Sequence, residues 1–339
     1  MKHTWIYFAA ALVATACMQS PADNTAELCK LKFDSWVTLN RKSSWEQTEL
    51  GSWIMEMDKG DIANQSVEDS EKWPYLRIEY TICKLDGTIS KTTSKDKARQ
   101  LGTYKKQNWY GPQFSSRASG GIYAGLEELI GMMGVGGHCK AAIPGWLLST
   151  SRYSSGEEYL KNLSSDTDAL IYEFTIVEAV SDPIEWQMER MKEALGSSWE
   201  QADSLADGVY YIQDKPASNP DTTFTSSSKV HINYCCRRLL DNAGVDSNIA
   251  DSAKVFGTWS SSSSYSASQI NWADSASELT MGSNSSDVID GFAYGILNMK
   301  PGEKGRVYMN SNYAYGSAGS GSAIPGYCPI YFEITFLEQ

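Results

Sequence analysis

The sequence predicts an α+β protein of two tandem domains, each a small antiparallel β-sheet wrapped on one short α-helix, joined by a helical linker. Two observations carry this prediction. The pentapeptide Ser-Ser-Trp-Glu-Gln occurs twice, at residues 43–47 and 197–201, and further matched segments follow each copy in the same order. Several of these segments alternate apolar and polar residues, as half-buried strands do. A chain of 339 residues is long enough for two domains that each bury a core.

The matched segments place the elements of each domain. The spacing between copies changes only in expected loops, where insertions are tolerated. The first and last pairs predict strands, and the middle pair precedes the short helix, which follows Gly125 in one copy and Gly291 in the other. The pairs are 76–80 with 230–234, 122–126 with 288–292, and 170–174 with 330–334.

A connecting helix is expected between the copies. Asp182 reads as its N-cap, Pro183 as its first residue, and Gly196 as its C-cap. Its apolar stripe of Ile184, Met188, Met191 and Leu195 has helical spacing, which indicates packing rather than a cofactor or peptide site. We therefore predict a first domain over 28–182, a linker over 183–204 and a second domain over 205–339.

The N-terminus reads as a targeting segment. Lys2, an apolar run and small residues predict a signal peptide over 1–16, and Cys17 then resembles the lipidated first residue of a bacterial lipoprotein, followed by a tether over 17–27. Ala14 stands where such a motif usually has Leu, and the alternative is an ordinary secretory signal with a chance Cys. The prediction is an extracytoplasmic chain, lipid-anchored to the cell envelope, specifically the outer membrane of a Gram-negative bacterium.

Composition excludes several functions. The net charge of -12 argues against a nucleic-acid partner, because phosphate binding needs a basic surface. Beyond the signal peptide only His138 and His231 remain, so we expect no His-based metal site, no Ser-His-Asp triad and no cofactor. Six cysteines follow Cys17 without a C-x-x-C pair, and we expect mostly buried free thiols.

The second copy resembles the FK506-binding-protein (FKBP) type of peptidyl-prolyl isomerase over about residues 205–339. The resemblance is carried by a strand ending in Tyr234, by Leu239-Leu240-Asp241, and by Val255-Phe256 as the next strand end. It continues through VIDGFAYGILNMKPGEKGRVYM, YAYG, AIPG and a final strand IYFEI. The first copy, about 28–182, resembles the family more weakly, through YTICKLDGT, IYAGLEELIGM and LIYEFTIVE.

Rotation about an X-Pro bond faces a barrier of about 20 kcal/mol and breaks no bond, so a dry apolar cradle with a few donors suffices and no cofactor is needed. The resemblance implies such a cradle in the second domain, with proline-containing polypeptide segments as partners. Phe292 is the expected floor of the cradle, and further aromatic side chains form its walls. Val288 and Ile289 close one side. The Ile289 N–H and the Tyr315 hydroxyl are the expected donors to substrate carbonyls. The expected site residues are Tyr234, Phe256, Val288, Ile289, Phe292, Tyr315, Ile324 and Phe332.

One departure from the family weakens the catalytic prediction, and a neighbouring insert is expected at the rim of the site. Gly257 follows Phe256 where the family has an Asp that polarises the site, and the Ser-rich stretch 260–264 lies beside this region. In the first copy Tyr80 is kept, but Leu126 occupies the position of the aromatic floor. The positions of the wall Phe, the Asp and the flap Tyr are occupied by Ile89, Ser90 and Ser149. The first copy is then a spacer, a dimerisation module or a client-binding module.

The favoured function is a folding helper that isomerises X-Pro bonds in envelope proteins through its second domain. A non-catalytic FKBP-like chaperone or peptide-binding lipoprotein is the first alternative. Glycan capture by exposed aromatic side chains is the second, resting on 11 Trp and 19 Tyr, although aromatic residues are more often core.

Overall fold

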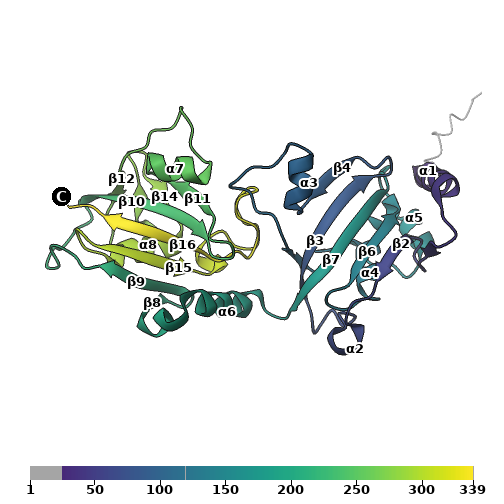
Figure 1. Cartoon of the computed structure of the whole chain (residues 1–339), viewed down its shortest axis with the longest axis horizontal. Helices are drawn as coiled ribbons and strands as arrows, with labels where there is room; N and C mark the ends of the chain where they lie inside the picture. The colour runs from purple at the N-terminus through teal and green to yellow at the C-terminus, as the bar shows by residue number, and fades with distance from the viewer. Residues whose placement is uncertain (1–24, 119, 339) are drawn as a thin grey trace, which may run out of the picture.

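A computed structural model describes residues 25–118 and 120–338, and Figure 1 shows two domains side by side, each with its own sheet and helices. The predicted α+β class is confirmed. The expected signal peptide and Cys17 lie outside the described residues. Within the described ranges, no helix has the length and apolar content needed to cross a bilayer.

The first domain is built on a seven-stranded antiparallel sheet with the order β1-β2-β6-β7-β3-β4, and β5 also pairs with β3. The long central strands β3 and β7 pair from Tyr75 to Lys84, with a register shift between Arg77 and Ile78. The strands are β1 Glu46–Gln47, β2 Trp53–Asp58, β3 Tyr75–Lys84, β4 Ile89–Thr92, β5 Gln113–Ser116, β6 His138–Ile143 and β7 Leu170–Val180.

The second domain has a nine-stranded antiparallel sheet with the order β14-β13-β12-β10-β16-β15-β9-β8, and β11 also pairs with β10. Its first strand begins at residue 203, two residues before the expected domain start. The strands are β8 Asp203–Ala206, β9 Val209–Lys215, β10 Lys229–Arg238, β11 Gly244–Ser247, β12 Ser268–Asn271, β13 Thr280–Met281, β14 Ser286–Asp287, β15 Lys304–Met309 and β16 Ile330–Phe336.

The two sheets share one core topology, as the sequence repeat predicts. The order β1-β2-β6-β7-β3 in the first domain corresponds to β8-β9-β15-β16-β10 in the second. The expected short helices are α4 (Ala124–Ile130) and α8 (Asp290–Asn298). Glycine lets each helix approach its sheet closely, since a Cβ on Gly125 would lie 2.6 Å from Ile143, and one on Gly291 would lie 2.5 Å from the sulfur of Met309.

The predicted linker helix is confirmed as α6 (Pro183–Leu195), which runs along the edge of the second domain in Figure 1. The Asp182 carboxylate accepts hydrogen bonds from the N–H groups of Ile184 and Glu185, and Gly196 is the C-cap. The apolar stripe is packing, as expected, because Met191 and Leu195 are buried against tyrosines of the second sheet.

Two local predictions differ from the structure, and the repeated pentapeptide folds differently in the two domains. The repeated pentapeptide leads into β1 in the first domain but forms a 3₁₀ helix, Gly196–Gln201, in the second, because α6 continues directly into it. Val255-Phe256 is not a strand end but the last turn of α7 (Ala250–Phe256). Besides the one helix expected there, the described part of the first domain has four more: α1 Thr25–Asn40, α2 Ile62–Gln65, α3 Lys95–Gln100 and α5 Gly156–Lys161.

The six cysteines within the described ranges are free thiols, and five of them are buried, as expected. Cys235 and Cys236 lie next to each other in β10 and point to opposite sides of the strand. Cys236 enters the core of the second domain, whereas the Cys235 thiol contacts the Ser247 hydroxyl at 3.3 Å.

Contacts between the domains join a loop of the first domain to a loop of the second, which meet at the centre of Figure 1. The Trp109 N–H donates to the Ser322 carbonyl at 2.8 Å, and the Ser322 hydroxyl donates to Asn108 at 3.0 Å. Tyr327 packs edge-on against Phe114. We call residues 313–328 of the second domain the flap. These hydrogen bonds and the ring contact connect it to the first domain.

Candidate functional site

Three aromatic rings of the second domain form the centre of the candidate site. Phe292 on α8 packs against Phe332 of β16 with ring centroids 4.5 Å apart, and against Tyr234 of β10 at 5.5 Å. Tyr234 and Phe332 are 5.9 Å apart. Phe292 and Phe332 are buried, whereas Tyr234 is half-buried. The sequence predicted all three, and the structure brings them together because strand alternation and the start of α8 direct them to one side of the sheet.

One polar pair completes this wall. The Tyr234 hydroxyl donates to the Asp246 carboxylate at 2.9 Å. Burial, followed by the charge of Asp246, raises the pKa of Tyr234, so the phenol stays protonated at neutral pH. Burial likewise raises the pKa of Tyr315 to about 12, with smaller contributions from Cys236 and Asp246. Two neutral phenols therefore lie close to one exposed carboxylate.

The remaining predicted residues surround this cluster. Val288 and Ile289 lie at the start of α8, half-buried against the core. The Ile289 carbonyl accepts from the first helical N–H groups, while its own N–H donates to no other group in the described part of the chain. Tyr315 and Ile324 belong to the flap, and Ile324 is 5 % exposed and packs into the core.

Phe256 stands apart from this cluster. It is buried, but its ring lies beneath Gly244, where an added Cβ would come within 2.2 Å of it, and beside the Arg237 guanidinium at 4.7 Å. Gly257 has φ +81° and ends α7 as its C-cap, a conformation that favours glycine. The position after Phe256 is therefore a helix terminus, and the carboxylate beside Tyr234 comes from β11 instead.

The sequence prediction missed Asp246 because pairing register, not sequence order, places it. Asp246 lies opposite Cys236, two residues beyond Tyr234 in β10. The signal available in the sequence was an acidic residue twelve positions after Tyr234, at the end of a short strand.

The Ser-rich stretch lies beside the site, as expected. A cavity of about 350 Å³ is lined by Tyr234 and Asp246 on one side and by Ser263, Ser264 and Tyr265 on the other. The stretch therefore forms a polar wall outside the aromatic cluster.

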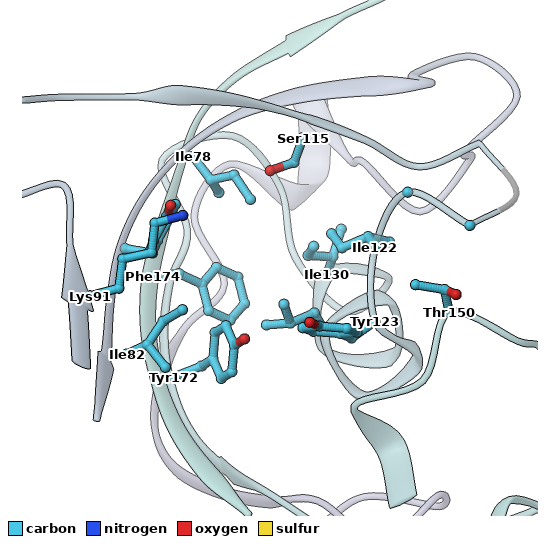
Figure 2. Close-up of a pocket in the computed structure, with 14 residues that line it drawn as sticks. Ile78, Ile82, Lys91, Ser115, Ile122, Tyr123, Ile130, Thr150, Tyr172 and Phe174 are labelled. Carbon is cyan, nitrogen blue, oxygen red and sulfur yellow. The ribbon is translucent and has the colours of Figure 1, made fainter. Parts of the chain in front are cut away.

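The first domain has a larger cavity at the equivalent place, about 520 Å³ in volume (Figure 2). Leu126 lies on its helical side and Tyr172 on its sheet side, at the positions that Phe292 and Phe332 hold in the second domain. The smaller Leu126 side chain leaves open a space that an aromatic ring fills in the second domain. The lining residues are Ile78, Tyr80, Ile82, Lys91, Ser115, Gly120, Gly121, Ile122, Tyr123, Leu126, Ile130, Thr150, Tyr172 and Phe174.

Arg238, at the end of β10, joins the flap to the first domain. Its side chain is 1 % exposed and donates two bonds to the Asp241 carboxylate, at 2.9 and 2.8 Å. The same guanidinium donates to the Gln107 carbonyl of the first domain at 2.7 Å and to the Ala323 carbonyl of the flap. One buried cation therefore connects β10, the flap and the neighbouring domain.

The aromatic cluster combines apolar rings with a few hydrogen-bonding groups. Across the described ranges, no group of three or more His, Cys, Asp or Glu side chains is placed to hold a metal ion. The cluster offers an apolar wall, hydroxyl groups and a free N–H, which can hold a ring-shaped apolar group beside a twisting carbonyl.

Residues 221–337 match the FKBP-type peptidyl-prolyl cis-trans isomerase family. The second domain therefore belongs to this family, whose members act on proline-containing peptides, and the match supports isomerase activity. The resemblance drawn from the sequence is confirmed for this domain. No curated protein sequence matches the chain.

Solved structures with some likeness include a peptidyl-prolyl cis-trans isomerase from Pseudomonas syringae pv. tomato, at 20 % identity and a TM-score of 0.33, covering 48 % of this chain and 96 % of that one. The three FKBP domains of wheat FKBP73 share 14 % identity at a TM-score of 0.30, covering 87 % and 98 %. The N-terminal domain of FKBP42 from Arabidopsis thaliana shares 16 % identity at 0.30, covering 40 % and 90 %. Because these TM-scores are low, the family assignment rests on the sequence match.

Proposed function

We propose that the chain isomerises X-Pro bonds in proteins of the cell envelope, acts there as a folding helper, and carries its active site in the second domain. The observation that carries the proposal is the cluster of Tyr234, Phe292 and Phe332 within the segment that matches the isomerase family. This cluster gives the prolyl ring an apolar floor and walls. Tyr315 and the Ile289 N–H are the donors to substrate carbonyls.

In this proposal Asp246 has the role that the family resemblance gave to the residue after Phe256. Its carboxylate accepts the Tyr234 hydroxyl at 2.9 Å and so fixes the ring that forms one wall. Its negative charge also acts on the site, although as an exposed carboxylate it is partly screened by water. Gly257 then needs no role in the reaction, and Phe256 supports β11 from beneath.

The envelope location rests on the N-terminal sequence. The signal peptide over 1–16 and lipidation at Cys17 would leave the mature chain tethered through residues 17–27 to the outer membrane. Cys17→Ser removes the acylated thiol, so we expect the variant chain in the soluble fraction and the unaltered chain in the membrane fraction. Equal membrane association of both would exclude lipidation as the anchor.

The activity is tested with the full chain in the refolding of a protein whose slow phase is proline isomerisation. We expect the unaltered chain to accelerate this phase, and both Tyr315→Phe and Asp246→Asn to lower kcat/KM by about tenfold, which corresponds to about 1.4 kcal/mol of lost transition-state stabilisation. Tyr104→Phe, a change of the same kind in the first domain outside both cavities, is the matched control and should keep full activity.

The test also separates the alternative function. If the unaltered chain leaves the slow phase unchanged but prevents aggregation of an unfolded protein, the chain is a non-catalytic chaperone. Thermal unfolding of each variant, measured beside the activity, shows whether a lost activity reflects a lost fold.

A further inference from the structure

The cavity of the first domain differs from the candidate active site in charge. In the first domain Lys91 of β4 lies opposite Ile82, two residues beyond Tyr80. In the second domain Asp246 of β11 lies opposite Cys236, two residues beyond Tyr234. Each strand pair also shifts register next to this position. Lys91 and Asp246 are therefore equivalent, and the charge at the mouth of the cavity is reversed.

Lys91 is the charged side chain of the cavity lining. Its ammonium lies 5.3 Å from the centre of the Tyr80 ring and forms no ion pair with a carboxylate of the described residues. The Tyr80 hydroxyl donates to the side-chain oxygen of Gln113 at 3.1 Å. The equivalent hydroxyl in the second domain, that of Tyr234, donates to the Asp246 carboxylate instead. A positive charge thus remains available at the cavity mouth, beside an apolar interior.

Inside the cavity one polar group lacks a partner. Tyr172 is only 6 % exposed, and Figure 2 shows it among the apolar lining residues, with its hydroxyl facing the cavity. This hydroxyl forms no hydrogen bond to any described residue, so it can pair with a ligand or with water in the cavity. Burial raises the pKa of Tyr172, so the group is a neutral donor at physiological pH. The equivalent residue in the second domain, Phe332, has no such group.

We propose that the first-domain cavity binds an apolar group that carries a carboxylate. The apolar part fills the space between Leu126, Ile130 and Phe174, a polar atom of the ligand pairs with the Tyr172 hydroxyl, and the carboxylate meets Lys91 at the mouth. Two sources supply this chemistry: a polypeptide that ends in an apolar residue, and a medium-chain fatty acid. The inference stands independently of isomerase activity in the second domain.

Isothermal titration of the full chain tests the proposal with two pairs of probes. One pair is an N-acetylated tripeptide ending in Phe with a free carboxylate, and the same peptide as its amide. The other pair is octanoate and octanol. We expect the carboxylate of at least one pair to bind about fivefold tighter than its neutral partner, the size of an exposed ion pair. The pair that shows this preference identifies the source.

Three variants locate the site. Lys91→Glu should reverse the preference, so that the neutral probe binds tighter, whereas Lys42→Glu, an exposed change of equal charge in the same domain outside the cavity, should keep it. Leu126→Phe should abolish binding of both probes because the ring fills the cavity. Thermal unfolding confirms that each variant is folded.

Equal affinity of charged and neutral probes in the unaltered chain overturns the proposal, and so does the absence of binding by all four probes. Unchanged binding in folded Leu126→Phe overturns it as well, because the ligand would then bind elsewhere. The proline-limited refolding assay runs in parallel without these ligands, so a failure of the isomerase function is seen separately.

Discussion

Arg238→Met is the sharpest test of how the two domains are joined. Methionine keeps most of the length and apolar volume of the arginine stem but removes the guanidinium, which is 1 % exposed. The change leaves the Gln107 and Ala323 carbonyls without their donor at the domain interface. A buried acceptor left unpaired costs about 1–3 kcal/mol. At about 1.5 kcal/mol each, in the lower half of that range, the two carbonyls together cost about 3 kcal/mol. Asp241 adds little, since its side chain is 38 % exposed and can be hydrated.

The assay is hydrogen exchange at the amide of Trp109, whose N–H donates to Ser322 across the interface. If the interface opens locally, a loss of about 3 kcal/mol speeds exchange by roughly 100-fold. Arg237→Met is the matched control, because Arg237 contacts Glu333 and Phe256 within its own domain. We expect less than a tenfold change there. Unchanged exchange at Trp109 in Arg238→Met, or equal changes in both variants, would refute the role of Arg238 as the link.

Three further predictions concern stability. Burial raises the pKa of the Cys139 and Cys328 thiols from 9.0 to about 12, so their stabilising contribution is complete below pH 9 and is lost as the pH rises toward 12. Urea unfolding should show a loss of about 1.4 kcal/mol per pH unit for each such thiol above pH 9, and Cys139→Ala should lower the slope of the unaltered chain by about that amount. Gly295→Ala places a Cβ 2.9 Å from the side chain of the adjacent strand and should destabilise the chain by about 1–2 kcal/mol, whereas Gly131→Ala, with its nearest neighbour at 3.5 Å, should be neutral in thermal unfolding. Asp182→Ala removes the N-cap of α6 and should cost about 1 kcal/mol in the same measurement; no change would show that the cap is replaced by water.

The tandem fold could be predicted because its signals are local and repeated. Alternating residues that end on Tyr80 and Tyr234 mark the two central strands, and Asp182 with Pro183 marks the start of the linker helix. The second-domain rings were found because strand alternation and the start of a helix place them. These features depend on neighbours in sequence, which sequence patterns record.

What the sequence did not show depends on pairing between distant segments. Phe256 has the apolar character of a strand end, yet it is the last residue of a helix that Gly257 terminates. The carboxylate beside Tyr234 belongs to Asp246 of β11, and the register of β11 against β10 places it there. The equivalence of Lys91 with Asp246 arises in the same way. The short β4 and β11 are four residues each, too brief for their alternation to reveal which side chain faces the site.

The flap of the second domain is fastened in part from outside its own domain, through Ser322 and Tyr327. A loop that closes over a binding site normally finds its resting position from its own hinges. Here part of that resting position is set by a neighbour, so cutting the chain between the domains changes the geometry of the flap without altering one of its residues. Proteolysis within the linker or the loop around Trp109 would therefore act on the candidate active site at a distance, and the two domains are best regarded as one working unit.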